Sequence, residues 1–319
     1  MTTRRIQYDE IGLLQKLLEE YPFRPYAYYR SLPSEATVNY LKASLAQSEL
    51  WGSFSDSGPV GLAAFKELAW DSEQLGFRVA KIDHLLAVGP YGQAIQTKKA
   101  LLDAMLTDPR NRGIRYIACR VNADDLSGLH LLEQQNFVTV DGILTFSLDL
   151  SRWFPTSMDI DYEVRPARES ELDEIRSIGA TAFVYDRFHS DPIIPRAIAD
   201  KLKATWVENA CRGVVADLVI VASKDHKVLG FVTCKINRSA GKCFGTGIGS
   251  LDLVAVSAEA RGKGVAYWIS QASLEWFKKN GMRFVEVGTQ FRNHAASTVY
   301  QKAGFKLVSS SITLRKWIG

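Results

Sequence analysis

The stretch LVAVSAEARGKGVAYWISQASLEWF, residues 253–277, joins an apolar, strand-like run to an amphipathic helix through a loop with two glycines and two cations. Val265, Trp268, Ile269 and Ala272 recur at the spacing of one helical face. A helix begins with unpaired backbone N–H groups and with the positive end of its dipole. The change from strand to helix therefore predicts an anion site at residues 261–266.

The composition of this loop indicates which anion it suits. Gly262 and Gly264 let the backbone approach an anion without a Cβ in the way, and Arg261 and Lys263 add positive charge. We predict a phosphate or pyrophosphate cradle at the carboxyl end of the strand. A P-loop is excluded, because Val265 follows Gly264 where that motif requires Lys and then Ser or Thr.

Two other glycine patterns are weaker. The dinucleotide fingerprint G-x-G-x-x-G is only half present, since its third glycine is missing. The run GTGIGS at residues 245–250 leads into a strand rather than a helix, and we expect it to be a flexible turn.

The length of 319 residues suits two domains. A strand ends near residue 150, and a link containing Pro, Thr and Ser follows, so we predict domains at residues 1–150 and 158–319. The second half alternates strands at 162–167, 217–237, 250–257, 283–290 and 305–317 with helices at 170–183, 195–211, 264–281 and 293–304. The run 217–237 is expected to be a hairpin that turns at KDHK. The fold class is α/β (α+β), a mixed twisted sheet with helices on both faces.

The first half contains a segment similar to one in the second half, which indicates an internal repeat. Residues 115–148 and 283–317 both run strand, Asn, helix, aromatic residue, strand. Asn122 parallels Asn293, although the first copy is three residues longer between the Asn and the aromatic residue. Leu132 stands where the second copy has Tyr300, and nothing in the first half matches residues 261–266. We therefore expect tandem domains of one fold, with a degenerate first copy.

Two motifs in the second half resemble those of the GNAT family of N-acetyltransferases. Residues 251–266 resemble its motif A, [RQ]-x-x-G-x-[GA], and residues 293–305 resemble its motif B, N-x-x-A-x-x-x-Y-x-x-x-G-F. The resemblance implies a tandem GNAT-like fold and acetyl-CoA as cosubstrate, with the coenzyme pyrophosphate on the loop amides. It also implies that the strand bearing Val254 and Val256 splays from its neighbour and offers free backbone groups to the pantetheine arm.

The resemblance assigns roles to particular residues. The coenzyme-binding residues that it implies are Val254, Ala255, Val256, Arg261, Gly262, Lys263, Gly264, Val265, Ala266 and Asn293. Tyr300 would protonate the leaving thiolate, and Asp252 would act as a base through water. Structural alternatives stay open: a core strand for Val254 and Val256, a helix N-cap for Asn293, a core residue for Tyr300, and a strand-end hydrogen-bonding residue for Asp252.

A closer resemblance, to sugar-nucleotide N-acetyltransferases of the dTDP-fucosamine type, covers much of residues 66–319. It implies that the acceptor is bound by Arg187, Phe188, His189, Trp206, Arg212 and Gln290. Arg187, His189 and Arg212 would contact the acceptor diphosphate, because cationic side chains suit phosphate oxygens. The alternatives are surface roles for Arg187 and His189, a helix-end cation for Arg212 and core packing for Phe188 and Trp206.

Composition excludes several functions. A net charge of +4 without a basic stripe argues against nucleic-acid and membrane-surface binding. The four cysteines and five histidines lack metal-ligand spacing, so we predict no metal site. No signal peptide or membrane span is recognised, which favours the cytoplasm, and a homodimer is allowed.

The sequence therefore predicts an N-acetyltransferase that moves acetyl from acetyl-CoA to a primary amine. A nucleotide-linked amino sugar is the favoured acceptor, with attack directly in a ternary complex. One alternative keeps the reaction and changes the acceptor to a small amine, an antibiotic or a protein amine. Another is a non-catalytic acyl-CoA sensor, against which Tyr300 argues.

Overall fold

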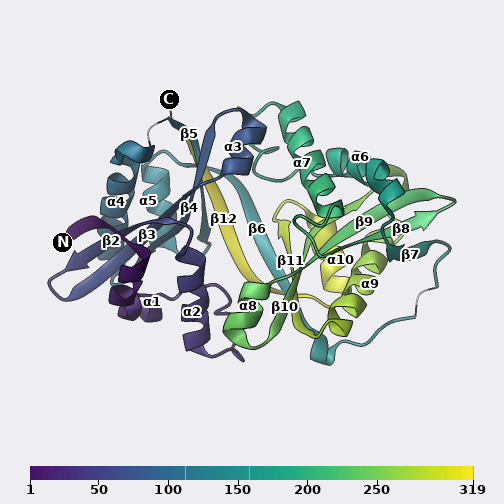
Figure 1. The fold of residues 1–319 in the computed structure, drawn as a ribbon, viewed down its shortest axis with the longest axis horizontal. Helices are drawn as coiled ribbons and strands as arrows, with labels where there is room; N and C mark the ends of the chain where they lie inside the picture. The colour runs from purple at the N-terminus through teal and green to yellow at the C-terminus, as the bar shows by residue number, and fades with distance from the viewer. Residues whose placement is uncertain (112, 158, 319) are drawn as a thin grey trace. The chain divides into compact units, whose positions relative to one another are not determined.

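The structure, a computed structural model, describes residues 1–111, 113–157 and 159–318. The first and last residues of the predicted second domain, Met158 and Gly319, lie outside them. The chain forms two compact units, residues 143–309 and residues 1–142 with 310–319 (Figure 1). Each unit is an α/β layer built on a mixed sheet.

The second unit holds the sheet β6-β11-β10-β9-β8-β7, in which β10 and β11 are parallel. Its strands are β6 (Val138–Asp149), β7 (Glu163–Pro166), β8 (Leu218–Lys224), β9 (Lys227–Ile236), β10 (Gly247–Val256) and β11 (Met282–Gln290). Its helices are α6 (Leu172–Ala182), α7 (Arg196–Cys211), α8 (Arg238–Phe244), α9 (Val265–Lys279) and α10 (His294–Lys302).

The first unit holds the sheet β1-β2-β3-β4-β5-β12, in which β4 and β5 are parallel. Its strands are β1 (Thr2–Ile6), β2 (Glu49–Ser55), β3 (Gly58–Glu67), β4 (Arg78–Ala87), β5 (Ile114–Asn122) and β12 (Lys306–Trp317). Its helices are α1 (Gln15–Glu20), α2 (Ser34–Leu45), α3 (Ala69–Leu75), α4 (Tyr91–Thr107) and α5 (Leu126–Gln134).

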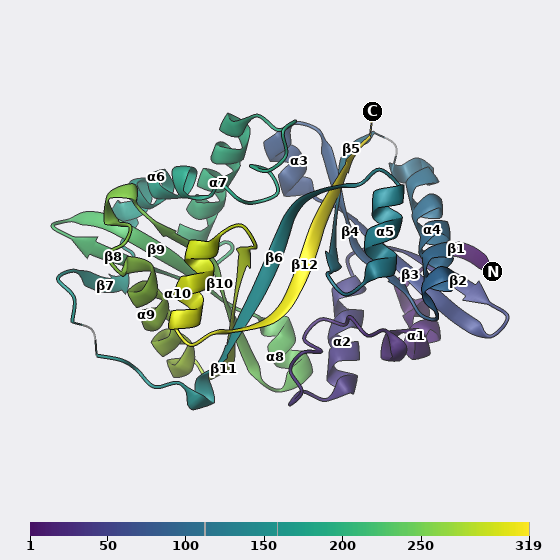
Figure 2. The same cartoon turned by 180° about the vertical axis from the view of Figure 1, so that it is seen from behind.

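Helices cover both faces of each sheet, as predicted. In the second unit, α9 and α10 pack on one face and α6 and α7 on the other, each over its own apolar cluster (Figure 2). In the first unit, α4 and α5 share one cluster, while α1 and α2 share another. Two clusters on opposite faces are what alternating strand residues produce when both faces are buried.

The units differ from the predicted ranges by an exchange of strands. Residues 143–149 of β6 pair with β11, and residues 311–317 of β12 pair with β5. A strand from the first half of the sequence thus completes the second unit, and the last strand of the chain completes the first. A boundary at residues 150–158 cannot describe such an exchange, because it assumes that each unit is one continuous segment.

Local expectations fare unevenly. The predicted hairpin is present, and it turns at Asp225 and His226, both with positive φ. The expectation of a flexible turn over residues 245–250 is wrong for most of its length. Gly245 ends α8, but β10 already begins at Gly247. Gly249 lies inside the strand. A glycine is needed there because the Phe277 ring of α9 occupies the space that a Cβ would need. Within the described residues, no helix is long and apolar enough to cross a membrane.

Candidate active site

The two central strands of the second unit part from one another. The parallel ladder runs from Gly247 opposite Met282 to Leu251 opposite Val287. In the described structure it ends there, although β10 continues to Val256 and β11 to Gln290. Residues 253–256 still pair with β9, and residues 288–290 still pair with β6. Each strand therefore presents one unpaired backbone edge to the other, which is the divergence that the sequence comparison predicted for Val254 and Val256.

A β-bulge marks the point of divergence. Leu251 lies opposite Cys234 of β9 and Leu253 lies opposite Thr233, so Asp252 is an extra residue. The bulge reverses the alternation of the strand: Leu251 faces the α9 and α10 cluster, whereas Leu253 and Ala255 face the α6 and α7 cluster. Val254 and Val256, both half-buried, pack on the α9 side.

Asp252 sits on this bulge with a hydroxyl on either side. The Ser250 hydroxyl donates a hydrogen bond to Asp252 Oδ1 at 2.6 Å, and the Leu253 N–H donates to Thr233 Oγ1 at 2.9 Å. Asp252 is partly open to solvent, but the protein atoms around it raise the pKa of its carboxyl above the ordinary value. The Ser250 hydrogen bond and the charge of Lys235 oppose that shift, and Asp217 supports it. A carboxylate with a raised pKa is a stronger base.

The glycine loop has the geometry of an anion cradle. Gly262 and Gly264 have φ of 79° and 76°, and Gly264 precedes the first residue of α9. Residues 261–264 are exposed, Val265 is buried, and Ala266 is half-buried. Within the described chain, the amides of residues 262–266 find no hydrogen-bond acceptor. Consecutive free amides at a helix start can bind the oxygens of a phosphate group.

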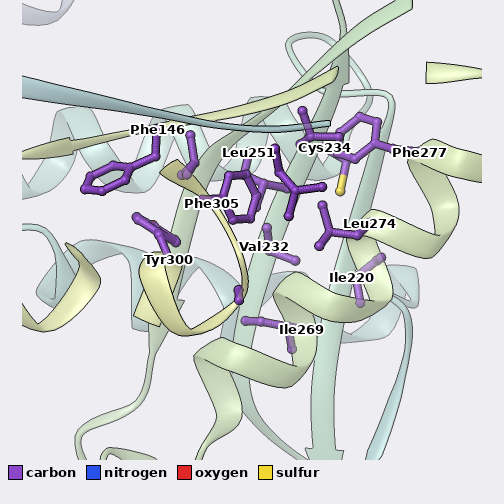
Figure 3. Close-up of a cluster of buried hydrophobic side chains, with 14 of the residues drawn as sticks. Phe146, Ile220, Val232, Cys234, Leu251, Ile269, Leu274, Phe277, Tyr300 and Phe305 are labelled. Carbon is purple, nitrogen blue, oxygen red and sulfur yellow. The ribbon is translucent and has the colours of Figure 1, made fainter. Parts of the chain in front are cut away.

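Tyr300 lies on α10 at the margin of the α9 cluster. Its ring contacts Phe146 and Phe305, with centroids 6.1 Å from each (Figure 3). The side chain is 4% exposed, and burial alone raises the pKa of its phenol above the ordinary value. Tyr300 therefore stays protonated across the physiological range and can act only as a proton donor there.

Asn293 and Gln290 lie at the turn between β11 and α10. Asn293 caps the helix, and its side-chain oxygen accepts a hydrogen bond from the Ala296 N–H at 3.2 Å. This is the N-cap alternative that the sequence left open. Gln290 ends β11, and its carbonyl accepts the Asn293 N–H at 2.8 Å. Both residues thus set where α10, and with it Tyr300, begins.

The residues expected to bind the acceptor lie around α7 and the segment before it. Phe188 is buried under the Arg187 guanidinium, which stands 4.5 Å above its ring. Trp206 is half-buried, with Lys203 Nζ 4.5 Å from its ring centre. Arg212 is exposed at the end of α7 and pairs with Glu208 at 2.8 Å.

His189 is held between two carboxylates. Its Nδ1 lies 2.6 Å from Asp186 and its Nε2 lies 3.0 Å from Asp200. Burial would lower the pKa of His189, but these two hydrogen bonds and charges outweigh it and raise that pKa. Because both ring nitrogens are bonded, the imidazole links the segment around Asp186 to Asp200 of α7. The contacts of His189 and Arg212 thus favour structural roles.

The described residues contain no group of three His, Cys, Asp or Glu side chains arranged to hold a metal ion. Residues 182–305, which contain the diverging strands, the glycine loop and Tyr300, match the model of the acetyltransferase (GNAT) family. This region of the chain belongs to the GNAT family of acetyltransferases.

The chain is also similar to two characterised proteins of bacteria. It is 26% identical over 269 residues to the spore coat polysaccharide biosynthesis protein SpsD of Bacillus subtilis (strain 168), covering 84% of this chain and 88% of that protein. It is 25% identical over 147 residues to the mycothiol acetyltransferase of Rhodococcus jostii (strain RHA1), covering 46% of each.

Solved structures share the fold of the whole chain. A GNAT protein from Sphaerobacter thermophilus superposes with a TM-score of 0.64 at 15% identity, over 99% of this chain and 95% of that one. A tandem GNAT protein from the clavulanic acid biosynthesis pathway gives 0.60 at 14% identity, over 100% and 98%. The predicted tandem GNAT fold is confirmed.

The central strands of the first unit correspond to those of the second in length and in the position of their bulge. Both β4 and β10 have ten residues, and both β5 and β11 have nine. The β4–β5 ladder stops at Ile82 opposite Cys119, although both strands continue, and a bulge places Asp83 where the second unit has Asp252. The N-cap of α5 is Asp125, not Asn122, which stands where the second unit has Gln290. Pairing Asp125 with Asn293 removes the apparent three-residue insertion.

Side chains of the first unit gather at its strand divergence. Lys98 of α4 is buried with Nζ 2.5 and 2.6 Å from the two Asp125 oxygens and 2.9 Å from the Ser127 hydroxyl. Tyr21 belongs to the α1 and α2 cluster on the opposite face. Burial raises the pKa of its phenol well above the ordinary value, and the nearby Asp125 charge adds to the rise. Tyr21 can approach Asp125 from the opposite face only because β4 and β5 part beyond Ile82 and Cys119.

The start of α4 also differs from the start of α9. A Cβ at Gly230 of β9 would lie 3.0 Å from Val265, the first residue of α9. A Cβ at the equivalent Gly61 of β3 would meet Thr97, which is six residues beyond the start of α4. The first turns of α4 therefore take the chain positions of the glycine loop, and Tyr91 at its start bonds His130 of α5 at 2.7 Å.

Sequence reasoning missed Ser250 and Thr233. Neither belongs to the motifs, and their hydroxyls matter only because the bulge brings them beside Asp252 and the Leu253 amide. The alternation of the strand gives a weak signal, since Ser250 and Asp252 stand two residues apart and so share a face in an extended strand.

Proposed function

We propose that this GNAT chain transfers the acetyl group of acetyl-CoA to the primary amine of an amino sugar, most simply one linked to a nucleotide. The supporting observation is that the unpaired edge of β10, which begins at Asp252, leads directly into the loop with free amides, and that Tyr300 lies on α10 of the same unit, after the partner strand β11. The relative named for spore coat polysaccharide biosynthesis supports a sugar acceptor.

The residues present fit an acyl-CoA. The amides of residues 262–266, with Arg261 and Lys263 beside them, would hold the pyrophosphate. The unpaired edge of residues 252–256, which includes Val254, Ala255 and Val256, would bond the pantetheine amides as an added strand does. Asn293 would act through the position of α10.

Asp252, which solvent reaches, and Tyr300, which is buried, would have opposite acid–base roles. Acetyl-CoA supplies the thioester. Asp252 would accept a proton from the attacking amine, directly or through water, because its pKa is raised and solvent reaches it. Tyr300 would give its proton to the departing sulfur, because burial keeps the phenol protonated. An N–C bond forms, the C–S bond breaks, and one proton leaves the amine while another reaches the thiolate.

The residues proposed for the acceptor side divide into direct contacts and residues that hold those contacts in place. Arg187, Phe188, Trp206 and Gln290 remain candidates for direct contact with the acceptor. We place His189 and Arg212 one step away, since both are engaged by carboxylates of the chain. In this arrangement His189 would shape the acceptor segment and Arg187 would supply the positive charge for a diphosphate.

The test is release of free thiol from acetyl-CoA in the presence of a panel of amines. Transfer to amino sugars or nucleotide-linked amino sugars alone supports the proposal. Transfer to small amines, antibiotics or protein amines but not to sugars would replace the acceptor while keeping the reaction. Coenzyme binding without transfer to any amine would favour an acyl-CoA sensor.

A further inference from the structure

The two units hold the same bulge carboxylate in different ways. Asp83 and Asp252 are each the sixth residue of their strand, β4 and β10. Two residues earlier the first unit has Lys81, whose Nζ lies 2.6 Å from Asp83 Oδ1. The second unit has Ser250 there, whose hydroxyl lies 2.6 Å from Asp252 Oδ1. One carboxylate is therefore an ion pair, and the other is held by a neutral hydroxyl.

We propose that Ser250 is a positioning residue that fixes the direction of the Asp252 carboxylate without neutralising it, so that Asp252 can take the proton of the acceptor amine. This inference rests on the proposed transfer reaction. An ammonium at position 250 would stabilise the charged carboxylate and occupy the oxygen that must accept the proton. A hydroxyl orients the same oxygen at a smaller cost in basicity.

The surroundings of Asp252 are consistent with this role. The charged and titratable groups that face it are Lys235 and Cys234 of β9 and Asp217, which precedes β8 and is paired at 2.6 Å with Arg238 of α8. Lys235 favours the charged carboxylate and Asp217 disfavours it, so the two oppose each other. The directional contact from Ser250 is then the local feature that distinguishes Asp252 from Asp83.

Thr233 holds the other side of the bulge. A bulge leaves one amide of the ladder without its backbone partner, and here the Thr233 hydroxyl accepts the Leu253 N–H. The equivalent residue of the first unit, the seventh of β3, is Ala64. Both hydroxyls that steady Asp252 are therefore absent from the copy in which the carboxylate is paired with lysine.

The experiment introduces the first-unit residue into the second unit. We expect Ser250→Lys to lower kcat for amine acetylation at least about tenfold, within the range that a general base contributes. The acidic limb of kcat/KM should move to lower pH, because the ammonium favours the charged carboxylate. The matched control is Lys81→Ser, which should leave both the rate and the pH profile unchanged. The Ser250→Lys variant should still fold, because the first unit already holds a lysine, 35% exposed, at the equivalent position 81.

A second pair of variants separates positioning from packing. Ser250→Ala removes a hydrogen bond to a charged group, so the acidic limb should move up by about one pH unit while kcat falls. Ser250→Thr keeps the hydroxyl and should restore the original profile. Thr233→Val should lower kcat more than it raises KM, and Thr233→Ser should recover it.

The outcomes are distinct. Wild-type rate and profile in both Ser250→Lys and Ser250→Ala would overturn the role of Ser250. The titration of the Asp252 carboxyl carbon, followed by NMR, reads the same shifts without any turnover. If wild-type protein transfers no acetyl group, the proposed function fails. In that case an Asp252 pKa unmoved by Ser250→Ala would overturn the hydrogen bond from Ser250 as well, and a raised one would uphold that contact alone.

Discussion

Single side chains of this protein gain their chemistry from where the fold buries them. Tyr300 matches a sequence motif, but a motif cannot show that its ring packs against Phe146 and Phe305 or that burial raises the pKa of its phenol. Asp252 was expected from its strand position, whereas the bulge that presents it arises from pairing with β9. Residue types at fixed spacing predict which groups can react, and long-range packing sets their proton affinities.

Tyr300→Phe should separate the acid role from structure. The phenyl ring fits the same apolar surroundings, so the free energy of unfolding should change by no more than about 1 kcal/mol. Turnover should fall by roughly 10² or more, because the departing thiolate loses its proton donor. Coenzyme affinity, measured by calorimetry, should stay near the wild-type value. Unchanged turnover would remove Tyr300 from the reaction.

His189 should make stability depend on pH. Its pKa is raised above the ordinary value of 6.5, so its stabilisation is complete below that pH and is lost as pH rises through the folded-state pKa. His189→Gln should therefore lower the melting temperature by several degrees at pH 6, for a loss of about 1–3 kcal/mol, and by less at pH 9. His226→Asn, in the exposed β8–β9 turn, is the control and should lower the melting temperature by less than His189→Gln at pH 6. An equal loss for His189→Gln at both pH values would mean that its charge contributes nothing.

At the scale of elements, the sequence predicts the individual helices and strands well but does not predict which strands pair with each other. The change from strand to loop to helix at residues 253–277 is present, with α9 beginning at Val265. The sequence also predicted the α10 helix and its terminating Gly304, which has φ of 95°. The exchange of β6 and β12 was not foreseen, because the partner of a strand depends on contacts far apart in sequence. The equivalence of Asn122 and Asn293 failed for a related reason, since the helix cap and not the residue type defines the position.

The glycine loop gives a prediction for one element. Gly264→Ile places a branched side chain at φ of 76°, where it is strained and distorts the loop that carries the free amides. Coenzyme affinity should fall at least about tenfold if those amides bind the pyrophosphate. Gly76→Ile, at φ of 75° with open space around it at the end of α3, carries the same strain in the first unit. Equal coenzyme affinity in both variants would show that the loop is only a turn.

At the scale of the whole molecule, a repeated fold need not mean a repeated site. The first unit keeps the diverging strands and the bulge, yet α4 begins earlier and takes the chain positions of the glycine loop. Lys98, Asp125 and Tyr21 then place charge and aromatic bulk beside the divergence. Leu132 stands where a proton donor would be needed. The first unit therefore lacks both the glycine loop and the tyrosine of the second unit.

We therefore expect one coenzyme per chain. Calorimetric titration of the full chain with coenzyme A should give a stoichiometry near one, and Gly264→Ile should remove that single binding event. Lys98→Met breaks the buried ion pair with Asp125 and should destabilise the first unit, by about 3–5 kcal/mol for an uncompensated buried charge, without changing the stoichiometry. Two binding events in the wild-type chain, the second surviving Gly264→Ile, would show that the first unit accepts the coenzyme despite these side chains.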